Sequence, residues 1–207
     1  MKIERLVTGE LQSNCYIVWD ENSLESIIID PGAESEKIGR LIDDKRLTVK
    51  YIVCTHGHFD HIGAVSEVKK KTGAKVVINK KDIEIYMHAG EFAASWGFNI
   101  KQPAEPDLLV ADGAELLAGN LHFRVLTTPG HSPGGICLHI QGVLFTGDTI
   151  FAGSVGRSDL YGGDIEDLKK SFLRLISLPP DTEIMPGHGG HTTVKKERIL
   201  NFFVHEI

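Results

Sequence analysis

A short histidine-rich run, from Thr55 to His61, constrains this chain of 207 residues more than any other feature of its sequence. The run reads T-H-G-H-F-D-H and directly follows residues 51–54, which have the composition of a buried strand. Imidazole and carboxylate groups are common zinc ligands. Side chains packed this closely cannot all bind one tetrahedral ion and leave a position for water, but they can serve two ions that share a bridging group.

Three further segments repeat the design of an apolar strand, a glycine-containing turn and a side chain that can bind a metal. They are residues 123–126 before His131, 143–145 before Asp148, and 183–185 before His188. Open α/β sheets place ligands on loops beyond the strand ends, where a rigid scaffold fixes them. We therefore expect one convergent two-metal site with Asp148 able to bridge, and its candidate ligands are His56, His58, Asp60, His61, His131, Asp148 and His188.

The remaining histidines and the cysteines lack this context. We interpret five histidines as surface or structural residues, namely His88, His122, His139, His191 and His205. Cys15, Cys54 and Cys137 are odd in number and widely spaced, which predicts buried, reduced thiols rather than disulfides.

Short apolar runs alternate with helical patterns along the chain. Buried strands are predicted at 27–29, 51–54, 76–78 and 143–145. Three helical faces are predicted, formed by Ile38, Leu41 and Ile42, by Leu168, Phe172, Leu175 and Ile176, and by Ile199, Leu200 and Phe203. Asp164 is expected to cap the second helix, and Thr192 or Thr193 the third. Since no linker or repeat interrupts this pattern, we predict one α/β domain over residues 1–207.

Residues 87–107 fit this pattern poorly. Phe92, Trp96 and Phe98 lie among small residues there, and two prolines follow them. The segment is either an irregular lid over the site or a peripheral helix packed on the core, and the sequence supports both interpretations equally.

The net charge and the hydropathy of the chain limit the kinds of partner that we expect. The net charge is −6 and the one short basic run is Lys69–Lys71, which disfavours a nucleic-acid partner because phosphates require a basic surface. No run of about 18 apolar residues is present, so no membrane span is expected. The N-terminus lacks the apolar core of a signal peptide, which predicts a cytoplasmic protein.

The run from Thr55 to His61, followed in order by His131, Asp148 and His188, resembles the metallo-β-lactamase superfamily. The resemblance extends from residue 14 to residue 188 and implies an αββα sandwich with its site at one edge of the two sheets. Within the superfamily the chain looks most like the glyoxalase-II-like (hydroxyacylglutathione hydrolase-like) branch. The motifs that carry this likeness are Asn14-Cys15-Tyr16, Asp30-Pro31-Gly32, residues 128–134, and Gly156-Arg157-Ser158-Asp159.

The resemblance implies roles for individual residues. The first metal would bind His56, His58 and His131, the second would bind Asp60, His61 and His188, and Asp148 would bridge. Two zinc ions per chain are expected, with iron or manganese as alternatives, and Asp60 and Asp148 are the expected catalytic carboxylates. Arg157 either contacts an anionic substrate or pairs structurally with Asp159. Glutathione-dependent members carry a further C-terminal helical domain that we do not expect here, which leaves glutathione specificity open.

These features predict a hydrolase for a small, anionic acyl thioester or ester, which would be attacked by a hydroxide bridging the two metals. A thiolate leaves without a general acid, because the pKa of a thiol is only about 8.5. Three alternative functions differ from this one in reaction class or in substrate. They are an Fe(II) persulfide dioxygenase using His56, His131 and Asp148, a lactonase using all seven ligands, and a non-catalytic metal-binding protein. The last is disfavoured because structural zinc sites are closed and four-coordinate.

Overall fold

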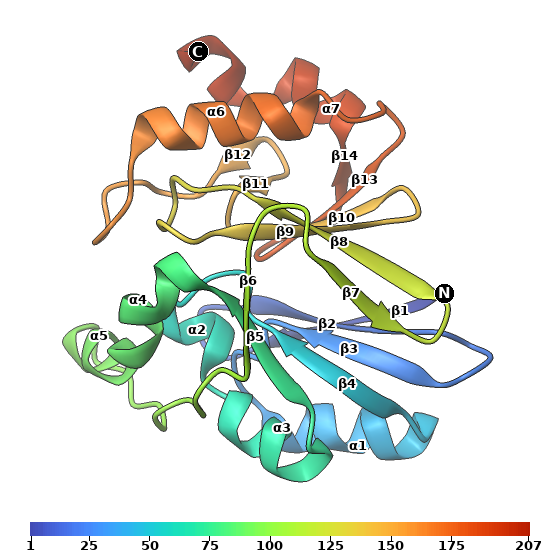
Figure 1. The fold of residues 1–207 in the computed structure, drawn as a ribbon. Helices are drawn as coiled ribbons and strands as arrows, with labels where there is room; N and C mark the ends of the chain where they lie inside the picture. Colours follow the sequence, from blue (N-terminus) through green and yellow to red (C-terminus); the bar gives the residue numbers. More distant parts are fainter.

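The computed structural model describes every residue from Met1 to Ile207, and two six-stranded sheets lie face to face in it (Figure 1). The strands of the first sheet follow chain order: β1 (Lys2–Thr8), β2 (Ser13–Trp19), β3 (Glu25–Ile29), β4 (Thr48–Val53), β5 (Lys75–Asn79) and β6 (Leu108–Val110). The first three strands pair antiparallel and the last four pair parallel. Parallel pairing requires crossovers, and helices α1 (Ser35–Lys45), α2 (Phe59–Ile62) and α3 (Val65–Thr72) lie in these connections.

The second sheet is built from the C-terminal half of the chain. Its order is β14 (Thr192–Thr193), β13 (Glu183–Pro186), β10 (Val143–Gly147), β9 (Ile136–Ile140), β8 (Leu121–Thr127) and β7 (Glu115–Ala118). A small hairpin, β11 (Ile150–Phe151) and β12 (Ser154–Val155), follows β10. Helices α6 (Ile165–Ile176) and α7 (Val194–Leu200) and the 3₁₀ helix η2 (Phe202–Glu206) cover this half (Figure 1).

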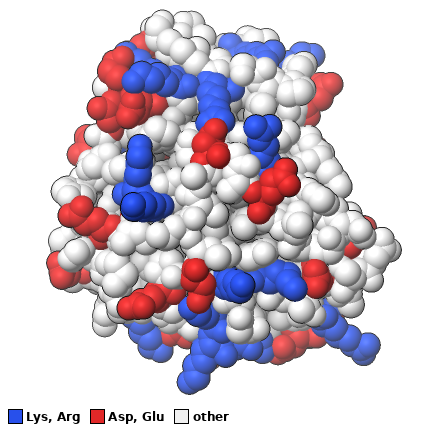
Figure 2. Space-filling model, viewed as in Figure 1, with Lys and Arg blue, Asp and Glu red and all other residues white.

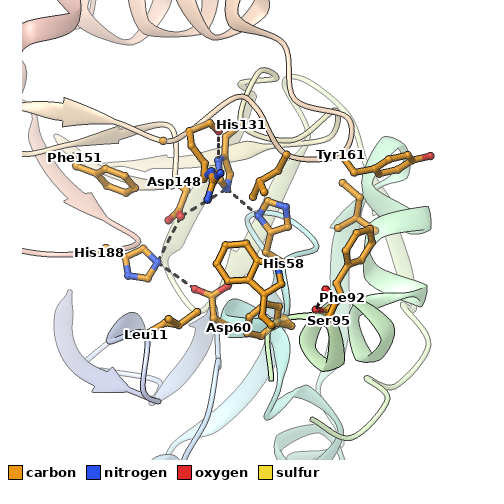
Figure 3. Close-up of a pocket in the computed structure, with 16 residues that line it drawn as sticks. Leu11, His58, Asp60, Phe92, Ser95, His131, Asp148, Phe151, Tyr161 and His188 are labelled. Atoms are coloured by element: carbon orange, nitrogen blue, oxygen red, sulfur yellow. Dashed lines mark hydrogen bonds and ion pairs between the residues drawn. The ribbon is translucent and has the colours of Figure 1, made fainter. Parts of the chain in front are cut away.

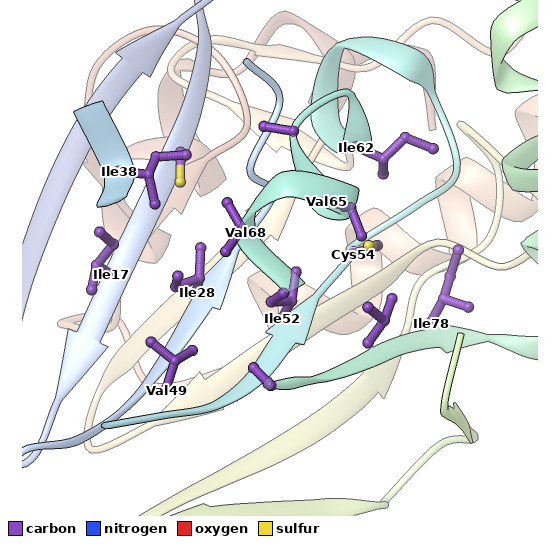
Figure 4. Close-up of a cluster of buried hydrophobic side chains, with 14 of the residues drawn as sticks. Ile17, Ile28, Ile38, Val49, Ile52, Cys54, Ile62, Val65, Val68 and Ile78 are labelled. Atoms are coloured by element: carbon purple, nitrogen blue, oxygen red, sulfur yellow. The ribbon is translucent and has the colours of Figure 1, made fainter. Parts of the chain in front are cut away.

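Apolar side chains fill three layers, which is why the central strands are apolar on both faces. Along β2, Ile17 points toward the helical layer, whereas Tyr16 and Val18 point into the space between the sheets. Figure 4 shows the first of these layers, where Ile28 and Ile52 of the sheet face Val68 of α3. A third cluster joins the second sheet to α6 and α7. The fold is therefore the predicted αββα sandwich.

Most predicted elements are confirmed. All four predicted strands lie within β3, β4, β5 and β10 apart from residue 54, which directly follows β4. Asp164 caps α6 by accepting a hydrogen bond from the Asp167 amide, and Thr193 caps α7 in the same way from Lys196. The three cysteines are free and buried, as expected.

One predicted helical face is wrong. Ile199 and Leu200 are exposed, whereas Phe203 is buried, so the three residues do not share a face. The reason is Asn201, whose extended backbone ends α7 and whose side-chain oxygen accepts a hydrogen bond from the Phe203 amide. The buried face of α7 consists instead of Val194 and Glu197.

The segment 87–107 combines features of both interpretations. Helices α4 (Ile83–Met87) and α5 (Ala89–Ser95) cover its start, and Ala89 and Ala93 pack into the first core cluster. The chain beyond Trp96 is irregular up to β6. The segment is thus a peripheral helical element, and its exposed side also borders the cavity described below.

The face of the molecule in Figure 2 is not strongly basic. In the view of Figure 2, lysine and arginine side chains are interspersed with aspartate and glutamate. No helix is both long enough and apolar enough to cross a bilayer.

Candidate metal centre

Four loops meet at one edge of the two sheets and carry all seven predicted ligand residues; Figure 3 labels five of them. The loop after β4 holds His56 and His58, and the first turn of α2 adds Asp60 and His61. The loops after β8, β10 and β13 supply His131, Asp148 and His188. Strands β8, β10 and β13 run in the same direction in the second sheet, so their ends lie at one edge, where residues up to 132 positions apart in the chain become neighbours.

The ligand atoms form two groups of three, each compact enough to surround one ion. The groups are His56, His58 and His131, and Asp60, His61 and His188, and within each the ligand atoms lie within 4.8 Å of one another. Asp148 lies between the groups. Its Oδ2 is 3.7 Å from Nε2 of His131 and 3.5 Å from Nε2 of His188. A single carboxylate therefore reaches both groups.

Hydrogen bonds fix the orientation of three of the histidine rings. Nδ1 of His131 donates to the Arg157 carbonyl oxygen at 2.7 Å, and Nδ1 of His61 donates to Asp30 at 3.0 Å. The Thr55 hydroxyl donates to Asp30, so its oxygen is left to accept from Nδ1 of His56. With Nδ1 protonated in each ring, Nε2 is left as the lone-pair nitrogen that a metal requires.

The lowered pKa values of two histidines in the first ligand group suit metal binding. Burial lowers the pKa of His56 well below its ordinary value, and burial lowers the pKa of His58 to about 3. Both imidazoles are therefore neutral near pH 7, which is the form that binds zinc. Burial also disfavours the charged form of His61, but the Asp148 and Asp60 carboxylates outweigh it and raise the pKa of this ring.

The arrangement fits a bound cation better than a self-contained polar cluster. Nε2 of His56 and Oδ1 of Asp148 are buried and have no hydrogen-bond partner in the protein. Burying such groups unpaired costs free energy, so a missing partner is indicated. An ion between the neutral imidazoles and the carboxylates would satisfy both atoms.

Asp30 supports two ligands, His61 directly and His56 through the Thr55 hydroxyl. It lies at the end of the buried strand β3 and accepts hydrogen bonds from the Thr55 amide at 2.7 Å, from the Thr55 hydroxyl at 2.6 Å and from His61. The sequence motif that contains Asp30 was noted only as a family likeness. An acidic residue directly after an apolar strand was the available signal for this role.

Asp82 was missed by the sequence analysis. Its buried carboxylate accepts hydrogen bonds from the amides of Gly57 and Gly134 and from the hydroxyl of Ser132. Gly57 separates two ligands of the first group and Ser132 follows the third, His131. Burial raises the pKa of Asp82. This one side chain therefore connects the two loops that carry the first ligand group.

The loop of His188 is held by residues of the motif Asn14-Cys15-Tyr16. The side-chain amide of Asn14 donates to the carbonyl oxygens of Pro186 and Gly189, at 2.8 and 3.0 Å, and the Tyr16 hydroxyl donates to Pro186 at 2.8 Å. A Cβ on Gly187 would collide with the Asp148 carboxylate. Only glycine allows the backbone to pass this close to the centre.

A cavity of about 450 Å³ opens onto five of the seven ligand residues, leaving His56 and His61 behind them. Arg157 also lines the cavity, but its guanidinium forms two hydrogen bonds with Asp159, at 2.7 and 2.6 Å, and lies 5.7 Å from the centre of the Trp96 ring. The pairing of Arg157 with Asp159 is present, and its contact with an anionic substrate stays a prediction. None of the five histidines interpreted as structural belongs to a ligand group.

Comparison with known proteins agrees with this geometry. The Metallo-beta-lactamase superfamily matches residues 8–188. The chain is 35% identical to hydroxyacylglutathione hydrolase GloC of Haemophilus influenzae, over 99% of this chain and 98% of that protein. It resembles TTHA1623 in a di-iron-bound form, with a TM-score of 0.90 and 39% identity over 97% and 99% of the two chains. It also resembles the BLEG-1 B3 metallo-beta-lactamase, with a TM-score of 0.91 and 33% identity over 98% and 99%.

These relatives share the fold over nearly their whole length, and the two ligand groups of this chain lie where its sheets meet. The family supports a metal-dependent hydrolase acting on a small molecule. This chain belongs to the metallo-β-lactamase superfamily.

Proposed function

We propose that this protein is a two-metal hydrolase that cleaves an acyl thioester or a related ester. His56, His58 and His131 would hold one ion, Asp60, His61 and His188 would hold the other, and Asp148 would contact both. Zinc is the proposed metal because neutral imidazole and carboxylate ligands suit it. Iron is the alternative to test, since the similar TTHA1623 is known in a di-iron form.

The observation that carries this proposal is the position of Asp148 between two complete ligand groups. Its Oδ2 lies at nearly equal distances from a histidine of each group, 3.7 and 3.5 Å. A mononuclear centre would need only one of these groups. In such a centre Asp60, His61 and His188 would have no ion to bind, although their ligand atoms also lie within 4.8 Å of one another.

The bound ions and the side chains of the protein would contribute different parts of the reaction. Bound divalent ions lower the pKa of water from about 15.7 toward about 7 and polarise a carbonyl group. Asp60 and Asp148 offset two of the four positive charges, so the centre keeps a positive field for the oxyanion that develops on the substrate. The cavity leads a carbonyl group directly to His58, Asp60, His131, Asp148 and His188. No general acid is needed when the leaving group is a thiolate.

The thioester class is supported by the likeness to GloC, which extends over 98% of that hydroxyacylglutathione hydrolase. The test combines metal analysis with an activity panel on zinc-loaded and iron-loaded protein. The substrates are an acyl thioester, a lactone, a β-lactam and glutathione persulfide. We expect two equivalents of metal per chain and thioester cleavage by the zinc form without oxygen. A plateau at one equivalent, or oxygen consumption on persulfide without thioester cleavage by either form, would overturn the proposal.

A further inference from the structure

Aromatic and aliphatic side chains form one broad wall of the cavity beside the ligand residues. The wall consists of Ile85, Phe92, Trp96, Leu160 and Tyr161. Figure 3 shows Phe92 and Tyr161 together on the side of His58, whereas Leu11 and Phe151 lie on the opposite side, near His188. A molecule whose carbonyl group reaches the ligand residues therefore has an apolar surface beside it.

Two large aromatic side chains of the wall are half exposed, whereas Ile85 is buried and Phe92 also packs against the first core cluster. Trp96 is 49% exposed and Tyr161 is 56% exposed. The ring centroids of Phe92 and Tyr161 are 6.1 Å apart and those of Phe59 and Trp96 are 6.4 Å apart, and the Tyr161 hydroxyl donates a hydrogen bond to Glu84 at 2.8 Å. Covering this exposed area with an apolar ligand would be favourable at roughly 25 cal/mol per Å².

The charges around the wall disfavour an anionic group there. Arg157 is the only lysine or arginine that lines the cavity, and its guanidinium is already paired with Asp159. The wall continues into a second hollow of about 400 Å³, which shares Phe92 and Tyr161 with the cavity and is lined by Glu84 and Glu91. A carboxylate at this end would meet two negative side chains and no free cation.

We infer that the acyl group of the substrate is apolar and uncharged and that it packs on Phe92, Trp96 and Tyr161. The assignment to the acyl side rests on the proposed thioester hydrolysis. A departing thiolate is anionic, so the acidic hollow repels it, whereas an alkyl or aryl acyl chain carries no charge toward Glu84 and Glu91. The acyl group therefore lies along the wall, and the thiol leaves on the side of Leu11 and Phe151.

Binding can be measured separately from turnover. The probes are thioether analogues of acyl N-acetylcysteamine thioesters in which a methylene stands between the carbonyl and the sulfur, so that no thioester bond is present. The series carries acetyl, butyryl, hexanoyl and adipoyl groups, the last ending in a carboxylate. Affinity for the zinc-loaded protein is read from tryptophan fluorescence, because Trp96 lies in the wall and the only other tryptophan, Trp19, is 8% exposed on β2.

We expect affinity to rise about threefold per added methylene from acetyl to hexanoyl, as apolar burial predicts. The adipoyl probe should bind at least about tenfold more weakly than the hexanoyl probe, because its carboxylate faces Glu84 and Glu91. Phe92→Ala should weaken hexanoyl binding about tenfold and leave acetyl binding within about twofold. Phe202→Ala removes an exposed ring from η2, outside the cavity, and should change neither.

Tyr161→Ala, in an exposed turn, is the second wall variant if Phe92→Ala does not fold. Equal affinity for the acetyl and hexanoyl probes, or tighter binding of the adipoyl probe, would overturn the inference. If the protein hydrolyses thioesters at rates that do not depend on acyl chain length, the inference about the apolar wall is rejected and the proposed function stands. If affinity depends on chain length but no metal form hydrolyses a thioester, the proposed hydrolysis is rejected and the inference about the apolar wall stands.

Discussion

The ligand loops and the aromatic wall line the same cavity but are built in opposite ways. Among the ligands that line the cavity, His131 is 6% exposed, whereas Trp96 and Tyr161 of the wall are about half exposed. Buried hydrogen bonds that the carboxylates of Asp30 and Asp82 accept fix the ligand loops. The wall is carried by the short helices α4 and α5 and the turn before α6, and it is held by ring packing and by the hydrogen bond from the Tyr161 hydroxyl to Glu84.

This difference follows from what each region must do. Metal-assisted chemistry tolerates little displacement of the ligands, so their loops are anchored to strands of both sheets. Substrate recognition through apolar contact tolerates small shifts, because the hydrophobic effect has no directional requirement. Substitutions in the ligand region should therefore cause large losses, and substitutions in the wall should cause small, substrate-dependent ones.

The largest loss is expected for Asp148→Ala. Its carboxylate contacts both ligand groups, so its removal should weaken both metal sites and nearly abolish turnover. Metal content per chain and the rate of thioester hydrolysis are measured together. His122→Ala, at an exposed position on β8, is the control and should bind two equivalents with normal activity. Substantial activity in the Asp148 variant would contradict the bridging role.

A somewhat smaller loss is expected for His61→Ala, which damages only the second group. Thioester hydrolysis should fall by at least about a hundredfold, in line with the loss of several kcal/mol of charge stabilisation. Metal analysis should show close to one equivalent. If the variant bound one equivalent and kept its rate, hydrolysis would depend on the first group alone.

Asp82→Asn tests the support of the ligand loops without removing a ligand atom. An amide cannot accept all three hydrogen bonds that the carboxylate accepts, so the Gly57 and His131 loops should loosen. We expect metal affinity to fall about tenfold or more, as for other residues that orient ligands. A competitive chelator titration measures it, with exposed Asp181→Asn as control. Unchanged affinity would show that the loops hold their geometry without this carboxylate.

The smallest effect is expected for Phe92→Ala in the wall. Catalytic efficiency should fall about tenfold for a hexanoyl thioester, mainly through KM, and little for an acetyl thioester. Metal content should stay at two equivalents. A uniform fall in kcat for both substrates would mean that the wall also positions the reacting carbonyl group, which would remove the contrast between the two regions.

Several features were predictable because they depend on local sequence. Strands β3, β4, β5 and β10 follow from apolar runs, and the caps at Asp164 and Thr193 follow from the residue types that accept hydrogen bonds from helix amides. The candidate ligands were identifiable because each directly follows a strand or a glycine turn. The face assigned to Ile199, Leu200 and Phe203 failed because periodicity alone does not reveal that Asn201 ends the helix.

The sequence by itself determined the residue types of the centre, the strands that precede them and the family to which the chain belongs. Only the tertiary structure decided how the ligand loops are held and what the cavity presents to a substrate. Asp82 reaches partners 25, 50 and 52 positions away, and Asn14 reaches Pro186 across 172 positions. The physical reason is that a hydrogen bond or a cavity wall depends on distance in space. Distance in space is set by the packing of the two sheets, whereas strand and cap patterns depend on immediate neighbours along the chain.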